Sequence, residues 1–172
     1  MMIMSLRALR AAAALSSMLA LAACANKNAT NDPSLANGAN GLNGAGTAAA
    51  PGTQQDFVVN VGDRVFFQED QSDLTGEAQS TLAKQARWLK TYPSYTITIE
   101  GHADERGTRE YNIALGARRA QATRDYLISQ GISAGRMRTI SYGKERPVAV
   151  CNDNSCWSQN RRAVTVLNGG NS

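Results

Sequence analysis

The amino-acid sequence predicts an α+β fold over residues 57–168, a β-α-β-α-β-β sandwich in which two helices pack on a mixed sheet. Two observations lead to this prediction. Short segments of alternating or β-branched apolar residues are interleaved with two longer segments whose apolar residues recur every three or four positions. Elements in this order bury their apolar faces in two packed layers. The segment is also long enough for a single modest core.

The first strand and the first helix follow from two adjacent segments. The run FVVNVGDRVFF, residues 57–67, is rich in β-branched and aromatic residues. We therefore expect a strand from Val61 or Arg64 to Phe67, with the earlier residues as its edge extension. Residues 75–91 follow with apolar positions on one helical face. These positions are Ala78, Leu82, Ala86 and Leu89.

The remaining elements are read in the same way. Residues 95–101 (YTITIEG) alternate between apolar and polar side chains, which indicates a half-buried strand. A second helix is expected over residues 108–130, with Gly131 as its C-terminal stop. Residues 137–142 and 162–167 are expected to be the third and fourth strands.

The N-terminus has the pattern of a secretory signal. Two arginines precede an uncharged run of Ala, Leu, Met and Ser over residues 11–23, which is too short to span a membrane. Residues 1–23 are therefore expected to be a signal peptide, and the alternative is a buried amphipathic helix. The following LAAC resembles a lipobox, which implies that the mature chain begins at a lipidated Cys24. Because Ala25 rather than Asp follows, we expect the outer membrane as the anchoring site.

Residues 24–56 are expected to form the lipidated Cys24 and a flexible tether. The segment is rich in Ala, Asn and Gly and has no aromatic residue or periodic apolar face, so it cannot offset the entropy of ordering. A flexible coil of this length spans roughly 30 Å. At the other end of the chain, residues 169–172 are expected to be a frayed tail.

The charge excludes one class of partner. The formal net charge is +4 and becomes +2 (4 − 2) once the two arginines of the signal peptide are removed. No run of Lys and Arg and no basic stripe interleaved with aromatic residues is present. We therefore expect no nucleic-acid partner.

The segment GHADERGTREYNIALGARRA, residues 101–120, concentrates the charged residues that are candidates for a site. On a helical wheel Arg119 lies at the shoulder of the apolar arc, between Leu115 and Ala122, whereas Arg118 lies on the polar side. A guanidinium there needs a partner supplied by the fold or by a ligand. The alternative is a side chain whose stem covers apolar surface while its head reaches water.

Asp104 is the second candidate. It is expected in the loop between a strand and the N-terminus of the second helix, a common place for binding sites. Gly101 and Gly107 bracket this loop and permit tight turns or a close backbone approach. The alternative is that Asp104 caps the helix or pairs with Arg106.

The same segment does not favour catalysis. Asp104 and Glu105 are adjacent, whereas paired glycosidase carboxylates face each other across a bond and usually come from separate elements. His102 is the single histidine, so a metal site is not favoured, and no nucleophile with a recognisable turn is found. We expect no enzyme activity, metal or cofactor, and we expect His102 to be a structural hydrogen-bonding residue.

This segment, followed by SYGKERPV and NRRAV, resembles the OmpA-like peptidoglycan-binding family over residues 60–168. In that family an Asp and an Arg fifteen residues later bind the diaminopimelate of the peptidoglycan stem peptide, and the matching residues are Asp104 and Arg119. The resemblance implies a pocket wall made of Arg106, Thr108, Asn112 and Leu115, with Phe67 and the backbone of Gln68 on another side. The family usually has an acid where this chain has Gln68, which leaves only backbone contacts there. Arg161 and Arg162 are framework candidates, one of which could line the site.

The resemblance, together with the lipobox, implies a function without catalysis. The chain would bind peptidoglycan non-covalently and so anchor the outer membrane to the cell wall. More narrowly, the chain resembles lipoproteins of the Tol envelope system, which implies Tol partners, chiefly the β-propeller protein TolB. A peptidoglycan hydrolase and a lipoprotein that binds only proteins are the alternatives.

The segment CNDNSC carries Cys151 and Cys156 in the loop before the last strand. In an oxidising periplasm two cysteines this close in sequence are expected to form a disulfide. The alternative is a metal-binding or reactive thiol role.

Overall fold

The computed structural model describes residues 49–169. The predicted signal peptide, Cys24 and residues 25–48 of the predicted tether lie outside the described residues, as do residues 170–172 of the predicted tail. Within residues 49–169, none of the helices combines the length and the apolar character that a membrane crossing requires. The elements are α1 (Gln54–Asp56), a π-helical turn (Phe57–Val61), β1 (Arg64–Phe66), α2 (Gly76–Thr91), β2 (Thr96–His102), α3 (Arg109–Ser129), a 3₁₀ turn (Ala134–Arg136), β3 (Met137–Gly143), α4 (Asn154–Asn160) and β4 (Arg162–Asn168).

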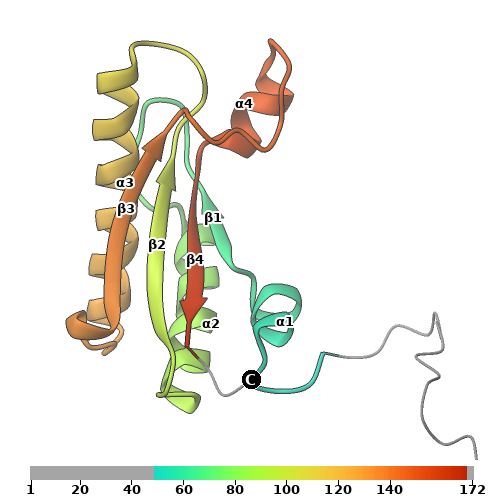
Figure 1. The fold of residues 1–172 in the computed structure, drawn as a ribbon, viewed down its shortest axis with the longest axis vertical. Helices are drawn as coiled ribbons and strands as arrows, with labels where there is room; N and C mark the ends of the chain where they lie inside the picture. Colours follow the sequence, from blue (N-terminus) through green and yellow to red (C-terminus); the bar gives the residue numbers. More distant parts are fainter. Residues whose placement is uncertain (1–48, 170–172) are drawn as a thin grey trace, which may run out of the picture. The chain divides into compact units, whose positions relative to one another are not determined.

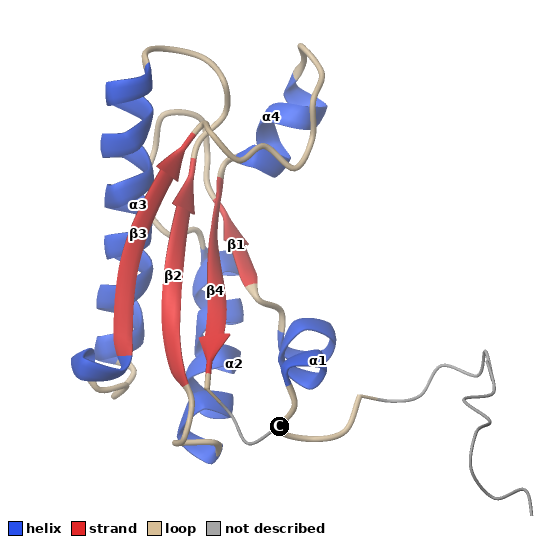
Figure 2. Cartoon of the chain, in the orientation of Figure 1, coloured by secondary structure: helices blue, strands red, loops and turns tan. Residues whose placement is uncertain are grey.

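The four strands form one mixed sheet in the order β1-β4-β2-β3. β2 and β3 are parallel, whereas β4 is antiparallel to both β1 and β2. The long helices α2 and α3 lie on the same face of this sheet (Figures 1 and 2). The predicted fold, two helices on a mixed sheet, is therefore confirmed.

Both long helices begin where their capping residues predict. The Thr75 hydroxyl accepts a hydrogen bond from the Ala78 N–H (3.2 Å) at the start of α2, and the Thr108 hydroxyl accepts one from the Tyr111 N–H (3.2 Å) at the start of α3. Gly131, with φ of 88°, follows the end of α3 in the left-handed conformation that stops a helix. The predicted apolar face of α2 is buried along its whole length: Ala78, Leu82, Ala86 and Leu89.

The predicted edge extension of the first strand is wrong, because residues 57–61 form a helical turn. The side chain of Asp56 accepts a hydrogen bond from the Trp88 indole (2.8 Å), and the Phe57 ring packs 4.9 Å from the Trp88 ring. Phe57 is only 1% exposed, so its burial outweighs the β-propensity of the segment. Gly62, with φ of 91°, ends the turn before β1.

The ordered domain begins earlier than predicted. Thr53 caps α1 by accepting from the Asp56 N–H (3.1 Å), and the Tyr95 hydroxyl donates to the Gly52 carbonyl (2.9 Å). These contacts attach residues 52–56, which were predicted as the end of the tether, to the domain. Residues 52–56 have no periodic apolar residues from which their attachment could be predicted, because hydrogen bonds rather than an apolar face hold them to the domain.

Helix α4 is a further difference, since the segment before β4 was predicted as a loop. The helix has seven residues, which is too short to be stable on its own. Asp153 caps it by accepting from the Ser155 N–H (2.7 Å), and a disulfide joins Cys151 to Cys156. The Asn160 side chain also accepts from the Val148 N–H (2.8 Å). The helix therefore depends on local cross-links that a periodicity of apolar residues does not reveal.

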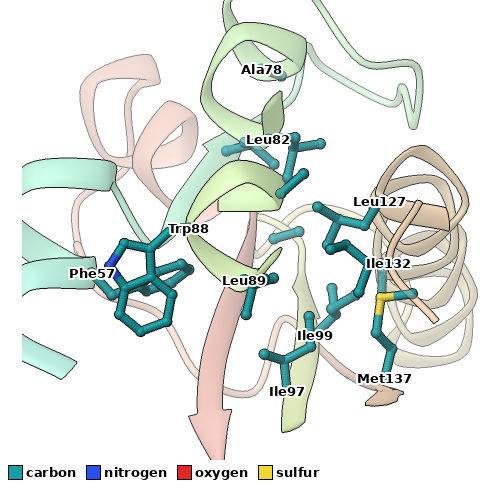
Figure 3. Packing of buried hydrophobic residues seen from close by; sticks show 14 of the residues in the cluster. Phe57, Ala78, Leu82, Trp88, Leu89, Ile97, Ile99, Leu127, Ile132 and Met137 are labelled. Atoms are coloured by element: carbon teal, nitrogen blue, oxygen red, sulfur yellow. The ribbon is translucent and has the colours of Figure 1, made fainter. Parts of the chain in front are cut away.

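The core lies between the sheet and the helices on its one face. Figure 3 shows Leu82 and Leu89 of α2 directed toward Leu127 of α3, with Ile97 and Ile99 of β2 beneath them. These residues are at most 1% exposed. The alternating apolar residues of β2 thus pack against the apolar face of α2 in one core layer, as the sequence predicted.

Two glycines let α3 approach β2 closely. A Cβ atom added at Gly101 would overlap the carbonyl of Gly116, and one added at Gly116 would lie 2.8 Å from the Gly101 oxygen and against the Ser141 hydroxyl. The Ser141 hydroxyl donates to the Ile113 carbonyl of α3 (2.7 Å), which fastens β3 to the same part of the helix. The start of α3 is therefore held at a fixed height over the sheet end from which Asp104 emerges.

Replacement of Gly116 by a larger residue is expected to destabilise the domain. Gly116→Ala should lower the free energy of unfolding by about 1–3 kcal/mol, because the added methyl overpacks a contact between two backbones. Gly76→Ala is the matched control, since no atom lies within 4 Å of its added Cβ and the position is helical. That variant should keep or raise stability. Equal losses for both variants in urea unfolding would contradict this interpretation.

Candidate functional site

The candidate residues gather at one end of the sheet. The loops that follow β1, β2 and β3 meet there, and α4 lies beside them (Figure 1). The β1–α2 loop contains Gln68 and Glu69, and the β2–α3 loop contains Asp104 and Arg106. The two charged residues that the sequence singled out, Asp104 and Arg119, both reach this end.

Asp104 is a nearly buried carboxylate, 7% exposed, that is surrounded by arginine donors. Its Oδ1 accepts from the backbone N–H and the Nε of Arg106 (both 3.2 Å), and its Oδ2 accepts from Arg106 Nη2 (2.7 Å) and Arg161 Nη1 (3.3 Å). Burial by itself raises the pKa of Asp104, but the hydrogen bonds from Arg106 and Arg161 outweigh it and hold the pKa below its usual value. The site therefore presents a permanent negative charge at neutral pH.

Arg106 is the outer member of this cluster. Its side chain is 35% exposed, and besides Asp104 it binds Glu69, with 2.6 Å between Nη1 and Oε1. The face of its guanidinium lies over the Trp157 ring of α4, 4.2 Å from the ring centroid. The prediction left open whether Asp104 pairs with Arg106 or serves a ligand, and in this structure it pairs.

Arg119 differs from its predicted position, because it lies in the centre of the buried face of α3 and not at the shoulder. The side chain is 0% exposed. Its Nε donates to the Gln71 carbonyl (2.8 Å), Nη1 to the His102 carbonyl (2.9 Å) and Nη2 to the Gln68 carbonyl (3.1 Å). The fold thus supplies partners for Arg119, and the alternative in which its head reaches water is wrong.

The guanidinium of Arg119 still has donor capacity. Five N–H groups are available on a guanidinium and three of them make the bonds described, which leaves one N–H on each terminal nitrogen (5 − 3 = 2). Burial lowers the pKa of Arg119 to about 10, while the charge of nearby Asp104 acts in the opposite direction. Arg119 is therefore a cation at neutral pH, and in the described part of the chain it is not ion-paired with Asp104.

The predicted pocket residues of the β2–α3 segment lie around Asp104 and mostly hold the loop. Thr108 is the N-cap of α3. The Asn112 amide is buried and donates to the carbonyls of Arg106 (2.7 Å) and Thr108 (3.0 Å). Leu115 is buried one turn further along α3. Thr108 and Asn112 therefore fix the backbone at the junction of this loop and α3.

The predicted residues of the β1 side lie against the arginines. The buried Phe67 ring is 5.2 Å from the Arg119 guanidinium carbon, and the Phe67 carbonyl accepts from Arg161 Nε (3.2 Å). Gln68 contributes its backbone carbonyl to Arg119. Of the two framework candidates, Arg161 lines the site beside Asp104, whereas Arg162 donates to backbone carbonyls away from it.

His102 does not fulfil its predicted role. Its ring is 2% exposed, yet neither ring nitrogen has a hydrogen-bond partner among the described residues. The ring lies 5.6 Å from the Tyr142 ring, and burial, followed by the charges of Arg162 and Arg146, lowers its pKa to about 4. His102 is thus a neutral packing residue at neutral pH. The Glu100 carboxylate, 3.7 Å away, is therefore not its ion-pair partner under those conditions.

Two residues of the site had no place in the sequence prediction. Glu69 binds Arg106, and the Trp157 indole donates to the Glu105 carboxylate while its ring supports Arg106. A signal for Trp157 existed, because a lone indole in the polar segment CNDNSCWSQN needs an apolar contact and a hydrogen-bond acceptor. Glu69 is one of several acids in its loop, and no pattern distinguished it.

The structure contains the Cys151–Cys156 disulfide, with 5.6 Å between the Cα atoms. Within residues 49–169 no group of three His, Cys, Asp or Glu side chains is placed to hold a metal ion. The described site consists of one carboxylate beside several guanidinium groups.

The fold and this site define a class of protein, namely α+β domains with a cluster of charged side chains at the strand ends. The model of the OmpA family matches residues 66–162, and the chain belongs to that family. It is 72% identical over 125 residues to the peptidoglycan-associated lipoprotein of Rhizobium meliloti, covering 73% of this chain and 71% of that protein. It is 52% identical over 97 residues to the peptidoglycan-associated lipoprotein of Pseudomonas aeruginosa, covering 56% of this chain and 57% of that protein.

Solved structures agree with the fold. The peptidoglycan-associated lipoprotein from Burkholderia pseudomallei matches with a TM-score of 0.60 and 42% identity, over 62% of this chain and 90% of that one. The C-terminal domain of Helicobacter pylori MotB matches with a TM-score of 0.59 over 63% of this chain and 85% of that one. Its identity is only 19%, so this likeness bears on the fold alone.

The buried, unpaired imidazole of His102 leads to a prediction. Because its pKa in the folded state, about 4, lies below the usual 6.5, protons bind the unfolded chain more readily in this interval. The stability contributed by neutral His102 is thus complete above pH 6.5 and is lost as the pH falls toward 4. NMR titration of the single histidine should give a pKa well below 6. A value near 6.5 would contradict its burial as a neutral ring.

Proposed function

We propose that this chain binds peptidoglycan non-covalently, through the diaminopimelate of the stem peptide, and anchors the outer membrane to the cell wall. The observation that carries the proposal is the placement of one carboxylate and one guanidinium at the same sheet end. Arg119 binds the carbonyl of His102, and Asp104 follows two residues later. The family and the names of the relatives, peptidoglycan-associated lipoproteins, support the same ligand.

The ligand chemistry fits these two residues. The diaminopimelate side chain ends in a free amino-acid centre with an ammonium and a carboxylate. The Asp104 carboxylate accepts from an ammonium, and the two unused N–H groups of Arg119 suit a carboxylate with two oxygens. A zwitterion supplies an ammonium for Asp104 and a carboxylate for Arg119, whereas a neutral sugar or an uncharged peptide supplies neither charge.

Binding requires an exchange at Asp104. A carboxylate has about four acceptor positions, and in the described structure four hydrogen bonds from Arg106 and Arg161 occupy them. A ligand ammonium must therefore replace one donor. Arg106 is that donor, because its side chain is 35% exposed whereas that of Arg161 is 7% exposed. One cation replaces another, which keeps the charge balanced and limits the net gain in affinity.

Access to Arg119 requires a similar movement. The carbonyls of Gln68 and Gln71, in the β1–α2 loop, cover its guanidinium, and Glu69 of the same loop binds Arg106. If Arg106 left Asp104, its bond to Glu69 would no longer hold the β1–α2 loop in place over Arg119. Binding at a single site is therefore expected to be weak, and many anchored copies would give effective attachment through avidity.

The same geometry argues against a peptidoglycan hydrolase. A glycosidase acid needs a raised pKa, whereas hydrogen bonds from arginines lower the pKa of Asp104. The adjacent Glu105 accepts from the Trp157 indole, so its carboxylate is directed to α4. Neither carboxylate has the environment that acid catalysis of glycoside cleavage requires.

The anchoring role combines this site with the N-terminal sequence. The expected signal peptide and lipidated Cys24 place the domain in the periplasm on the outer membrane. The described chain enters the domain at α1, which lies toward the other end of the sheet from α4 and the site (Figure 1). The site thus lies at the opposite end of the sheet from the point where the described chain enters the domain. The likeness to the lipoproteins also implies Tol partners, chiefly TolB.

The proposed charge recognition is tested by isosteric variants. Asp104→Asn should weaken binding to purified sacculi by about tenfold or more, because a charge-assisted bond to the ligand ammonium is lost. Arg119→Lys should also lose binding, since an ammonium cannot serve the loop carbonyls and a ligand carboxylate together. Arg118→Lys is the matched control at the exposed neighbouring position. Loss of co-sedimentation in the control, or retention in Asp104→Asn, would contradict the assignment.

The ligand itself is tested with two tripeptides. L-Ala-D-Glu-meso-diaminopimelate should bind in calorimetry or NMR titration, and the L-Lys analogue should bind about tenfold more weakly or worse. The analogue keeps the ammonium but lacks the carboxylate, so the bidentate bond to Arg119 is lost. Equal affinities would show that Arg119 does not bind the ligand carboxylate. Release of soluble fragments from sacculi would instead support the hydrolase.

A further inference from the structure

Helix α4 contacts the residues that surround Asp104, although the candidate pair itself lies elsewhere, with Asp104 in the β2–α3 loop and Arg119 on α3. Its first residue, Asn154, accepts a hydrogen bond from Arg161 Nη2 (3.2 Å). The same guanidinium donates through Nη1 to Asp104 (3.3 Å) and through Nε to the Phe67 carbonyl (3.2 Å). Arg161 thus has three partners, and one of them belongs to α4.

A second contact fastens α4 over the β2–α3 loop. The Trp157 indole donates to the Glu105 carboxylate, and its ring lies 4.2 Å from the guanidinium carbon of Arg106. The helix therefore touches the two residues that directly follow Asp104 in the sequence. Any shift of α4 would alter the surroundings of this carboxylate.

The helix cannot hold this position by its own stability. Seven residues form fewer than two full turns, and an isolated helix of that length does not persist in water. The disulfide ties Cys156, inside the helix, to Cys151 in the preceding loop. The Asn160 side chain binds the same loop at Ala149, donating to its carbonyl (2.8 Å). The disulfide and this hydrogen bond therefore fix both turns of α4 to the loop.

We infer that α4, held by the Cys151–Cys156 disulfide, is a positioning element of the binding site, in which Asn154 orients Arg161 toward Asp104. This inference rests on the proposed function for its ligand, but its geometric part stands on the described contacts. Arg161 is the buried partner of Asp104 and remains in place when Arg106 is exchanged for a ligand ammonium. A correctly oriented Arg161 keeps the carboxylate ionised and directed at the ligand.

The inference predicts a specific result for two kinds of variant of the full-length protein. Asn154→Ala removes the acceptor, and the double variant Cys151→Ser with Cys156→Ser releases the helix. In both, the pKa of Asp104, measured by NMR of its side-chain carboxyl carbon, should rise toward its usual value. Affinity for the tripeptide L-Ala-D-Glu-meso-diaminopimelate should fall by about 3- to 10-fold, because a charged hydrogen bond is misdirected rather than removed.

Two controls separate positioning from general loss of stability. Gln159→Ala changes an exposed residue of the same helix and should alter neither the pKa of Asp104 nor the affinity. Ile132→Val removes one methylene from the core outside the site and should lower stability without moving that pKa. A purely structural role of the disulfide would make the double variant resemble Ile132→Val.

The outcomes distinguish the inference from the proposed function. A raised pKa of Asp104 with weakened binding supports both. An unchanged pKa in Asn154→Ala and in the folded double variant overturns the inference, whatever the binding. A raised pKa with unchanged tripeptide affinity supports the positioning of Asp104 but contradicts its place in the ligand site. If the unmodified protein fails to bind the tripeptide, the proposed function fails, and the pKa comparison still decides the inference.

Discussion

The site depends on the hydrogen bonds that the Arg119 guanidinium donates to backbone carbonyls. This guanidinium is completely buried and donates to three backbone carbonyls, two in the β1–α2 loop and one at the end of β2. Without these carbonyls the buried guanidinium would be an uncompensated charge, and without the guanidinium the three carbonyls would each lose a charged donor. The two therefore stabilise each other. Removal of either would release the β1–α2 loop from the strand end that carries Asp104.

The position of this guanidinium depends in turn on the backbone of α3. Because Gly101 and Gly116 lack side chains, the helix lies close enough to β2 for the Arg119 side chain to pass beneath the β1–α2 loop. Larger residues at either glycine would lift the helix and withdraw the guanidinium from the carbonyls. The close packing of two backbones is thus a condition for the electrostatics of the site.

The charges at this end of the sheet are arranged so that one carboxylate is shared among several cations. Asp104 binds Arg106 and Arg161, and Arg119 lies nearby without an ion pair to it. Two of these guanidinium groups are buried and fixed, whereas Arg106 is partly exposed and supported by Glu69 and Trp157. In the proposed binding, Arg106 is the cation that a ligand ammonium would replace, because it is the most exposed of the three.

The sequence by itself determined the elements with regular patterns and the residues that a motif marks. The periodicity of α2, the alternation of β2 and the segment GHADERG are local properties, so the helix, the strand and Asp104 could be predicted from neighbouring residues alone. Only the tertiary structure decided the helical turn at Phe57, the helix α4 and the role of Trp157. These depend on partners far apart in the sequence, such as Asp56 with Trp88 and Glu105 with Trp157. Arg119 shows the same limit, because a helical wheel does not reveal the carbonyls that the β1–α2 loop and the end of β2 bring to its guanidinium.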